Sequence, residues 1–509
     1  MRLDLDNLPQ DTALLHQLVR DMADLVSTRN DEISRLQQII KQLQRAHYGR
    51  RSERLDPDQL TLGLEDLDAD IAEVEEDRPV AARDASEPRP CRKPLPDHLP
   101  REEIVLDIPG DACPDCGGPR HAVGESVSEM LDWVPASVRV IRIRRPKYAC
   151  RQCSTLQQAP APERVIAGGL ATPALIAHVL VSKYADHLPL YRQAKIFARH
   201  GVELERSTLA GWVGGACWWL DALHDRLARH VFASDHIFAD DTPIPVLDPG
   251  RGRTKTGRLW VYARDQQGWA GPEPPAAVCF YEPDRKAERP KAHLVDYRGT
   301  LHVDGYAGFE QLTAGGKIRL AACWAHTRRK FYEIAKADGA PVALETVQRI
   351  AELYAVETQI RGKAPDERLV IRQATSRPLV DALHAWLQCQ LPRLSARGKL
   401  AEAIRYALTR WDGLTRFLDD GRVELDTNPV ERAIRPVALG RKNHLFAGSD
   451  GGGKRWATMA SLIETAKLNA VEPHAWLSDV LARMANGHPA NQLDDLLPWN
   501  WIPASAVHT

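Results

Sequence analysis

The fold is decided by three stretches of the sequence: F-A-D-D-T at residues 238–242, H-V-D-G-Y at 302–306 and T-N-P-V-E-R-A-I-R-P at 427–436. The first two place Asp240 and Asp304 at the ends of apolar runs that are typical of buried strands. The third places Glu431 at the start of a predicted helix. Pro429 suits the first turn of that helix, and Thr427 or the following Asn is its expected cap.

Apolar runs around these acids predict a five-stranded mixed sheet, with strands at residues 236–239, 259–263, 277–281, 300–303 and 318–323. Acids that end the first and fourth of five such strands are the layout of a ribonuclease-H-like core. The interval between Asp304 and Glu431 is longer than a compact core of this type needs. We therefore expect a mainly helical insertion at about residues 335–420.

A chain of 509 residues is too long for one hydrophobic core and predicts a multidomain α/β protein. The expected segments are a coiled-coil helix at 1–55, an acidic proline-rich linker at 56–100, a zinc ribbon at 101–165, a helical helix-turn-helix region at 166–230, the core at 231–440 and a basic loop with helices at 441–509. The start M-R-L-D-L-D-N has no apolar signal core, and we find no apolar run of membrane-spanning length, so we expect a cytoplasmic protein.

Apolar residues recur at heptad spacing from Leu15 to Leu43, which predicts a dimerising coiled coil. Arg29 and Glu32 interrupt the seam, and a long helix packed on its own chain is the alternative. The linker that follows is best explained as a solvated spacer. Its acids would otherwise shield a DNA-binding surface.

Two C-x-x-C pairs, Cys113 with Cys116 and Cys150 with Cys153, offer four thiolates to one structural Zn²⁺ ion. A paired redox role is the alternative, and it is disfavoured because no thioredoxin-like βαβ pattern surrounds either pair. The intervening segments alternate as strands should, which makes a ribbon. Its candidate phosphate contacts are Arg142, Arg144, Arg145 and Lys147, unless they form a charged solvated strand face.

The segment from Leu188 to Val213 resembles a helix-turn-helix, with Gly201 in the turn and Ser207 as the cap of the second helix. A plain helical hairpin is the alternative. The DNA-reading candidates at the start of that second helix are Arg206, Ser207 and Thr208.

A glycine-rich stretch at residues 448–455 fits the pattern G-x-x-x-x-G-K of a P-loop. Arg455 stands where a P-loop has the Ser or Thr that holds Mg²⁺, so we interpret the stretch as a flexible basic loop that grips DNA phosphates. Cys323 and His326 have ligand-type side chains, but packing at the end of a strand explains them better. The other basic candidates for DNA contact are Arg328, Arg329, Arg432, Arg435, Arg441, Lys442, Lys454 and Arg455.

These strings occur in the order typical of one family. Together with H-Y-G-R-R-S-E at residues 47–53, C-W-A-H-T-R-R-K-F at 323–331 and G-R-K-N-H-L-F-A-G-S-D at 440–450, they make the chain resemble the insertion-sequence-66 transposases of bacteria from end to end. The chain differs from the family pattern at Asp241, where the family usually has Glu.

The resemblance implies a D-D-E transposase with Asp240, Asp304 and Glu431 as its catalytic triad. Such an enzyme binds the terminal inverted repeats of its element, cleaves the 3′ ends and joins them to target double-stranded DNA. Phosphodiester chemistry of this kind uses two Mg²⁺ or Mn²⁺ ions per active site, held by carboxylates. The expected partners are DNA, a second copy of the chain or more, and small accessory proteins, with no membrane. A non-catalytic zinc-containing DNA-binding regulator and a P-loop motor are the alternatives.

Overall fold

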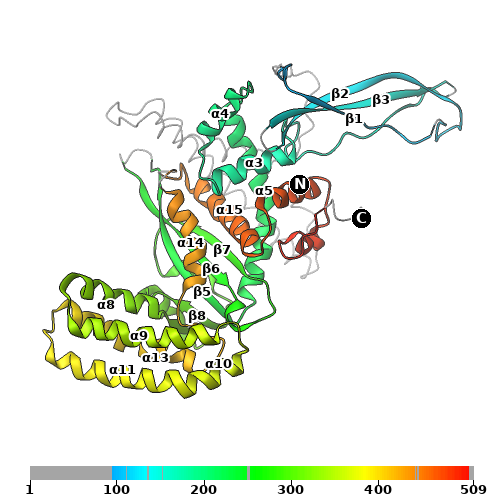
Figure 1. Ribbon diagram of the computed structural model, residues 1–509. Coiled ribbons are helices and arrows are strands. Elements are labelled where there is room, and N and C mark those ends of the chain that lie inside the picture. Colours follow the sequence, from blue (N-terminus) through cyan, green and yellow to red (C-terminus); the bar gives the residue numbers. More distant parts are fainter. Residues whose placement is uncertain are drawn as a thin grey trace, which may run out of the picture.

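The computed structural model describes residues 94–503 except 111, 135–136, 152, 249–252, 442 and 444–445 (Figure 1). The predicted coiled coil, most of the predicted linker and Lys442 lie outside the described residues. In the described part, no helix combines the length and the apolar character needed to cross a membrane.

The N-terminal sheet is dominated by a long antiparallel hairpin, as the alternating pattern predicts. Its four strands are β1 (Arg101–Val105), β2 (Arg120–Val134), β3 (Ser137–Cys150) and β4 (Leu156–Gln158). Strand β3 pairs with all three others, and Val138, Val140 and Ile143 on it are buried. The hairpin extends away from the rest of the molecule in Figure 1.

Three helices follow: α3 (Pro173–Tyr184), α4 (Leu190–Arg199) and α5 (Arg206–Phe232). Gly201 connects α4 to α5 with a φ of +73°, a conformation that favours glycine. Helix α5 begins at Arg206 after Glu205, so the prediction that Ser207 caps it is wrong. Helix α5 is 27 residues long and its leucines are buried against β7, α15 and neighbouring helices, so most of it belongs to the core.

The central sheet has five strands in the order β7-β6-β5-β8-β9. The strands are β5 (His236–Val246), β6 (Lys255–Arg264), β7 (Ala276–Glu282), β8 (Gly299–Val303) and β9 (Ile318–Ala322). Strands β5, β6 and β7 pair in antiparallel fashion, whereas β5, β8 and β9 run parallel. Short helices α6 (Glu288–His293) and α7 (Ala307–Glu310) flank β8. All five strands lie where the apolar runs predict them.

Asp240 does not end its strand, which corrects the expectation. Strand β5 continues to Val246 because its second half pairs with β6, from Asp241 opposite Trp260 to Val246 opposite Lys255. The parallel pairing with β8 stops at Phe238. Asp240 therefore lies just beyond the end of the parallel part of the strand, and Asp304 directly follows β8.

A layer of helices forms the predicted insertion and has its own apolar core, which includes Trp324, Phe331 and Ile350. Its helices are α8 (Trp324–Asp338), α9 (Pro341–Ile360), α10 (Pro365–Ile371), α11 (Arg377–Gln390), α12 (Lys399–Thr409) and α13 (Trp411–Thr415). Figure 1 shows this layer at the opposite end of the molecule from the β2–β3 hairpin.

The chain then returns to the sheet through α14 (Asn428–Gly440), α15 (Asp450–Leu468) and α16 (Pro473–Ala485). The glycine-rich stretch is the first turn of α15, so the prediction of a flexible loop is wrong. The N-cap Ser449 accepts a hydrogen bond from Gly452 N. A Cβ at Gly453 would lie 2.6 Å from the Tyr281 ring, which shows that close packing requires this glycine.

Candidate active site

The strand register brings two of the predicted acids to one edge of the sheet. Phe238 of β5 pairs with His302 of β8, and Asp240 and Asp304 each lie two residues beyond that pair. Helix α14 packs against β5 and β6 and carries Glu431 in its first turn. The helix starts at Asn428, whose backbone N–H donates to Asp426 at 3.1 Å, while Thr427 makes no side-chain cap hydrogen bond.

The electrostatics of Asp240 show that the three acids converge. Burial, together with the negative charges of Asp304, Asp241 and Glu431, raises the pKa of Asp240 to about 8. The Asp241 N–H donates to Asp240 Oδ1 at 2.7 Å, and the Tyr306 N–H donates to Asp304 Oδ1 at 2.9 Å. Crowded carboxylates with hard oxygen donors are well suited to binding a divalent cation.

The raised pKa predicts a pH-dependent stability in buffer free of Mg²⁺ and Mn²⁺. The folded state holds the Asp240 proton more tightly than the unfolded state does, so the free energy of unfolding should fall as the pH rises from about 4 to 8. The slope for this one group is about 1.4 kcal/mol per pH unit. Urea unfolding should therefore show Asp240→Asn gaining stability relative to the wild type as the pH rises. If the difference in unfolding free energy between Asp240→Asn and the wild type stayed constant from about pH 4 to 8, it would contradict the prediction.

Asp241 points away from Asp240 into a buried ion-pair cluster. Its side chain is 1% exposed and accepts hydrogen bonds from Arg258 at 2.8 Å and from Arg285 at 2.7 and 3.0 Å. The Arg285 guanidinium also lies 4.2 Å from the centre of the Tyr306 ring, next to Asp304. Asp241 thus fixes an arginine at the margin of the site.

Asp241→Asn should lower the free energy of unfolding by ~2 kcal/mol, because it leaves two arginines without their charged partner. Chemical denaturation measures this loss. The matched control is Glu333→Gln on α8, whose exposed side chain should tolerate the change. Equal denaturation midpoints for the two variants would contradict the conclusion that the ion pairs of Asp241 stabilise the fold.

A second group of ligand-type side chains meets at Glu431, and sequence reasoning explained two of its members, Cys323 and His326, as packing. Cys323, His326 and Glu431 each offer one ligand atom, and these atoms lie within 4.8 Å of one another. The His326 Nδ1 atom is 3.6 Å from Glu431 Oε1. The Thr427 hydroxyl lies between Glu431 and Cys323, 3.0 Å from Glu431 Oε1 and 3.3 Å from the Cys323 sulfur. The third member comes from far along the chain, so spacing could not reveal it.

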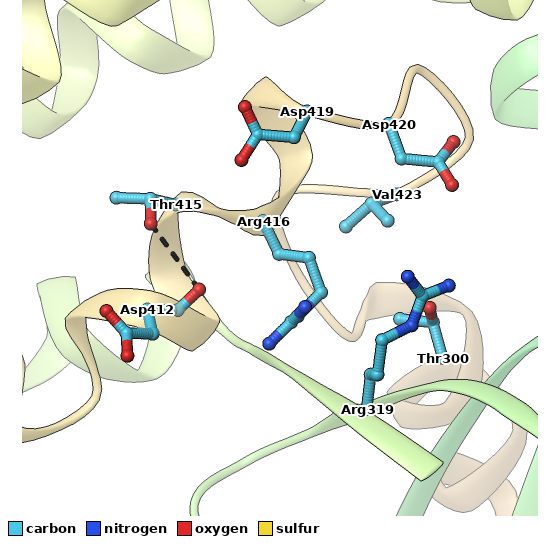
Figure 2. Close-up of a pocket in the computed structure, with 8 residues that line it drawn as sticks. All are labelled: Thr300, Arg319, Asp412, Thr415, Arg416, Asp419, Asp420 and Val423. Atoms are coloured by element: carbon cyan, nitrogen blue, oxygen red, sulfur yellow. Dashed lines mark hydrogen bonds between the residues drawn. The ribbon is translucent and has the colours of Figure 1, made fainter. Parts of the chain in front are cut away.

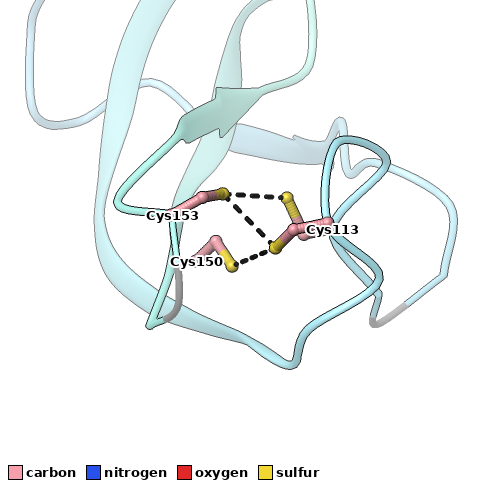
Figure 3. A group of neighbouring side chains, drawn as sticks. Cys113, Cys150 and Cys153 are labelled. Carbon is pink, nitrogen blue, oxygen red and sulfur yellow. Dashed lines mark hydrogen bonds between the residues drawn. The ribbon is translucent and has the colours of Figure 1, made fainter.

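The four predicted zinc ligands also come together (Figure 3). The Cys113–Cys153, Cys116–Cys150 and Cys116–Cys153 sulfur atoms are 3.4 to 3.5 Å apart. A tetrahedral site with Zn–S bonds of about 2.3 Å needs sulfur separations of about 3.8 Å. Hydrogen bonds from Thr155 lower the pKa of Cys153 to about 6, whereas hydrogen bonds with Cys150 and Cys153 raise the pKa of Cys116 to about 12. These residues fit one structural Zn²⁺ ion.

The predicted basic face of the ribbon is largely neutralised by acids on neighbouring strands. Arg142 pairs with Glu129 and Glu103, and Arg144 pairs with Glu125 and Glu103. The Arg145 guanidinium donates to the Ala159 carbonyl. These contacts favour the alternative of a charged strand face.

The other predicted DNA contacts differ in exposure. Arg455 is 2% exposed, and Arg441 donates to the Pro243 carbonyl at 2.7 Å, so neither fits a flexible phosphate-gripping loop. The partly buried candidates are Lys147, Arg206, Thr208 and Arg328. The exposed candidates are Ser207, Arg329, Arg432, Arg435 and Lys454.

One polar cavity lies apart from the three acids. Figure 2 shows Arg319, Arg416 and Asp420 lining a cavity of about 440 Å³ between the sheet and the helical layer. Thr300 at this cavity belongs to the beginning of β8, whereas Asp304 follows its end. The cavity is therefore at the opposite end of the strand from the acidic site.

Comparison with known proteins agrees with this organisation. A family model described as "Transposase IS66 family" matches residues 168–455. Three more models match smaller parts: "zinc-finger binding domain of transposase IS66" at 111–154, "IS66 C-terminal element" at 461–499 and "Transposase C of IS166 homeodomain" at 35–104.

Two relatives are described as uncharacterized proteins of Sinorhizobium fredii (strain NBRC 101917 / NGR234). The protein y4jD is 43% identical over 516 residues, which cover 98% of this chain and 98% of the relative. The protein y4qI is 43% identical over 488 residues, which cover 93% of this chain and 90% of the relative.

Proposed function

Because this chain belongs to the IS66 transposase family, we propose that Asp240, Asp304 and Glu431 form a D-D-E active site that cuts and joins DNA. The proposed substrate is double-stranded DNA that carries the terminal inverted repeats of the element. Cleavage frees a 3′-OH, which then attacks the target DNA. The observation that carries the proposal is the convergence of three acids from distant parts of the chain, reflected in the raised pKa of Asp240.

The topology of the sheet supports a ribonuclease-H-like core. In sequence order the strands lie 3-2-1-4-5, with the first three antiparallel and the last two parallel to the first. The acids follow the parallel part of the first strand and the end of the fourth. The sequence predicted acids at the ends of the first and fourth strands, and only Asp304 follows the end of its strand.

The residues of the site fit a pair of hard divalent cations. When bound, two Mg²⁺ or Mn²⁺ ions supply an activated nucleophile, neutralise the phosphate oxygens and stabilise the leaving 3′-oxygen. The three carboxylates hold these charges in place. In the described residues the ligand atoms of these three acids do not all lie within 4.8 Å of one another. The protein itself supplies no covalent nucleophile.

The exposed basic side chains near the site are the proposed DNA contacts. Arg432 and Arg435 lie on the same helix as Glu431, and Lys454 lies in the first turn of α15. Arg432 is 3.1 Å from Asp265 and would have to exchange this partner for phosphate. Phosphate contacts position the duplex, and sequence readout at Ser207 and its neighbours on α5 would select the repeat.

A cleavage assay on labelled DNA that contains the terminal repeats tests the proposal. The full chain should nick the 3′ ends with Mg²⁺ or Mn²⁺ and should be inactive with Ca²⁺ or without a divalent cation. A chain that binds the repeats tightly and never cuts them with either metal would instead be a regulator.

A further inference from the structure

The polar cluster of Cys323, His326 and Glu431 is partly buried where the end of β9 meets α8 and the start of α14. Cys323 lies directly after β9 and is 3% exposed, and His326 is in the first turn of α8. Two polar atoms here are buried without a hydrogen-bond partner among the described residues, His326 Nδ1 and the Tyr354 hydroxyl. The negative charges of Asp426, Cys323 and Glu431 contribute to a raised pKa of Tyr354, after burial as the main cause.

A buried polar atom without a hydrogen-bond partner destabilises the folded state, so the unpaired Nδ1 of His326 indicates a missing partner. Here a sulfur, an imidazole nitrogen and a carboxylate oxygen face one point. The 3.6 Å between His326 Nδ1 and Glu431 Oε1 is close to the edge of about 3.4 Å expected for two ligands of a tetrahedral zinc ion.

We propose that Cys323, His326 and Glu431 bind a single Zn²⁺ ion, distinct from the ion of the four-cysteine ribbon. A mixed sulfur, nitrogen and oxygen set suits zinc better than Mg²⁺, which prefers oxygen ligands alone. Three protein ligands leave a fourth position for water. The site belongs to the catalytic core, whereas the ribbon site belongs to the N-terminal sheet.

The shared ligand gives the site a consequence that rests on the proposed function. Glu431 has two carboxylate oxygens, and Oε1 already faces Cys323 and His326. Zinc binding would fix the side chain from this side and leave Oε2 for the cations of the D-D-E site. The ion would therefore act as a positioning device for the third catalytic acid.

The zinc content of the full chain, purified from zinc-supplemented cells, tests the proposal. Elemental analysis should find about two zinc ions per chain, one on the ribbon and one on this cluster. Cys323→Ser and His326→Ala should each halve the content. The matched control is Cys389→Ser, since Cys389 is an exposed cysteine of α11 and its loss should leave both ions bound.

Cobalt substitution gives a second readout that does not depend on retention during purification. Cys150→Ser weakens the ribbon site but leaves its other three thiols, so the signal of the second site is the thiolate-to-cobalt absorption that Cys150→Ser shows and the double variant with Cys323→Ser loses. A wild type with one zinc, together with a Cys150→Ser variant that shows no thiolate-to-cobalt band, would overturn the proposal. So would a second zinc that persists in both Cys323→Ser and His326→Ala.

The outcomes also separate this proposal from the proposed function. A chain with two zinc ions that never cuts DNA would refute the D-D-E assignment and leave the Cys-His-Glu site standing. A chain that cuts DNA and holds only the ribbon zinc would support the D-D-E assignment and refute the Cys-His-Glu site.

Discussion

Asp304→Asn should abolish cleavage of the terminal repeats and joining to target DNA, while binding of the repeats persists. The amide keeps the shape of the side chain and its contact with the Tyr306 N–H, but removes a charge that Asp240 senses directly. Loss of one preorganised electrostatic group slows such chemistry on the order of a thousandfold. Gel-based cleavage of labelled DNA with Mg²⁺, alongside a binding assay at fixed salt, measures both effects.

The control for this variant is Glu333→Gln, an equal loss of charge on the exposed face of α8. It should cut DNA at the wild-type rate. Asp241 is unsuitable as a control because its carboxylate is buried against Arg258 and Arg285, so its loss would affect folding as well. Normal cleavage by Asp304→Asn would refute the proposed mechanism.

Cys150→Ser should release the ribbon zinc and unfold the N-terminal sheet. Metal binding to such modules contributes ~10 kcal/mol or more to folding. Cys150 is buried at the end of β3, which pairs with every other strand of this sheet, so the damage should spread through the ribbon. Limited proteolysis and zinc analysis should show cleavage between about residues 101 and 160, with the central sheet and its helices still resistant.

Cys217→Ser is the comparison for the ribbon variant, since it also removes a buried thiol, but from α5. It should keep the ribbon zinc. Full retention of zinc by Cys150→Ser would remove this residue from the metal site.

Much of the central fold could be predicted because its signals are local. The five strands contain the apolar runs, and three of them have nearly the expected bounds, whereas β5 and β6 extend beyond theirs because they pair with each other. The C-x-x-C spacing likewise identified four sulfur atoms that the fold brings together. The family assignment from ordered motifs is confirmed by the family model that covers residues 168–455.

Where the predictions failed, the missing information was a neighbour from elsewhere in the chain. The glycines at 451–453 resembled a flexible loop, yet they belong to helix α15, and the Tyr281 ring of β7 packs against Gly453. Arg142 and Arg144 resembled a phosphate-binding face, yet β1 and β2 bring glutamates to them.

By itself the sequence determined which residues form strands, which cysteines share a ligand geometry and which three acids are candidates for catalysis. It could do so because burial pattern and motif spacing depend on residues that are close together in the sequence. Only the tertiary structure decided which of these side chains are neighbours, and with that their charge, pKa and ligand geometry. The register of β5 against β8 placed Asp240 beside Asp304, and the return of α14 placed Glu431 beside Cys323 and His326. The physical reason is that charge, pKa and ligand geometry depend on distances between side chains, and packing of remote segments sets these distances.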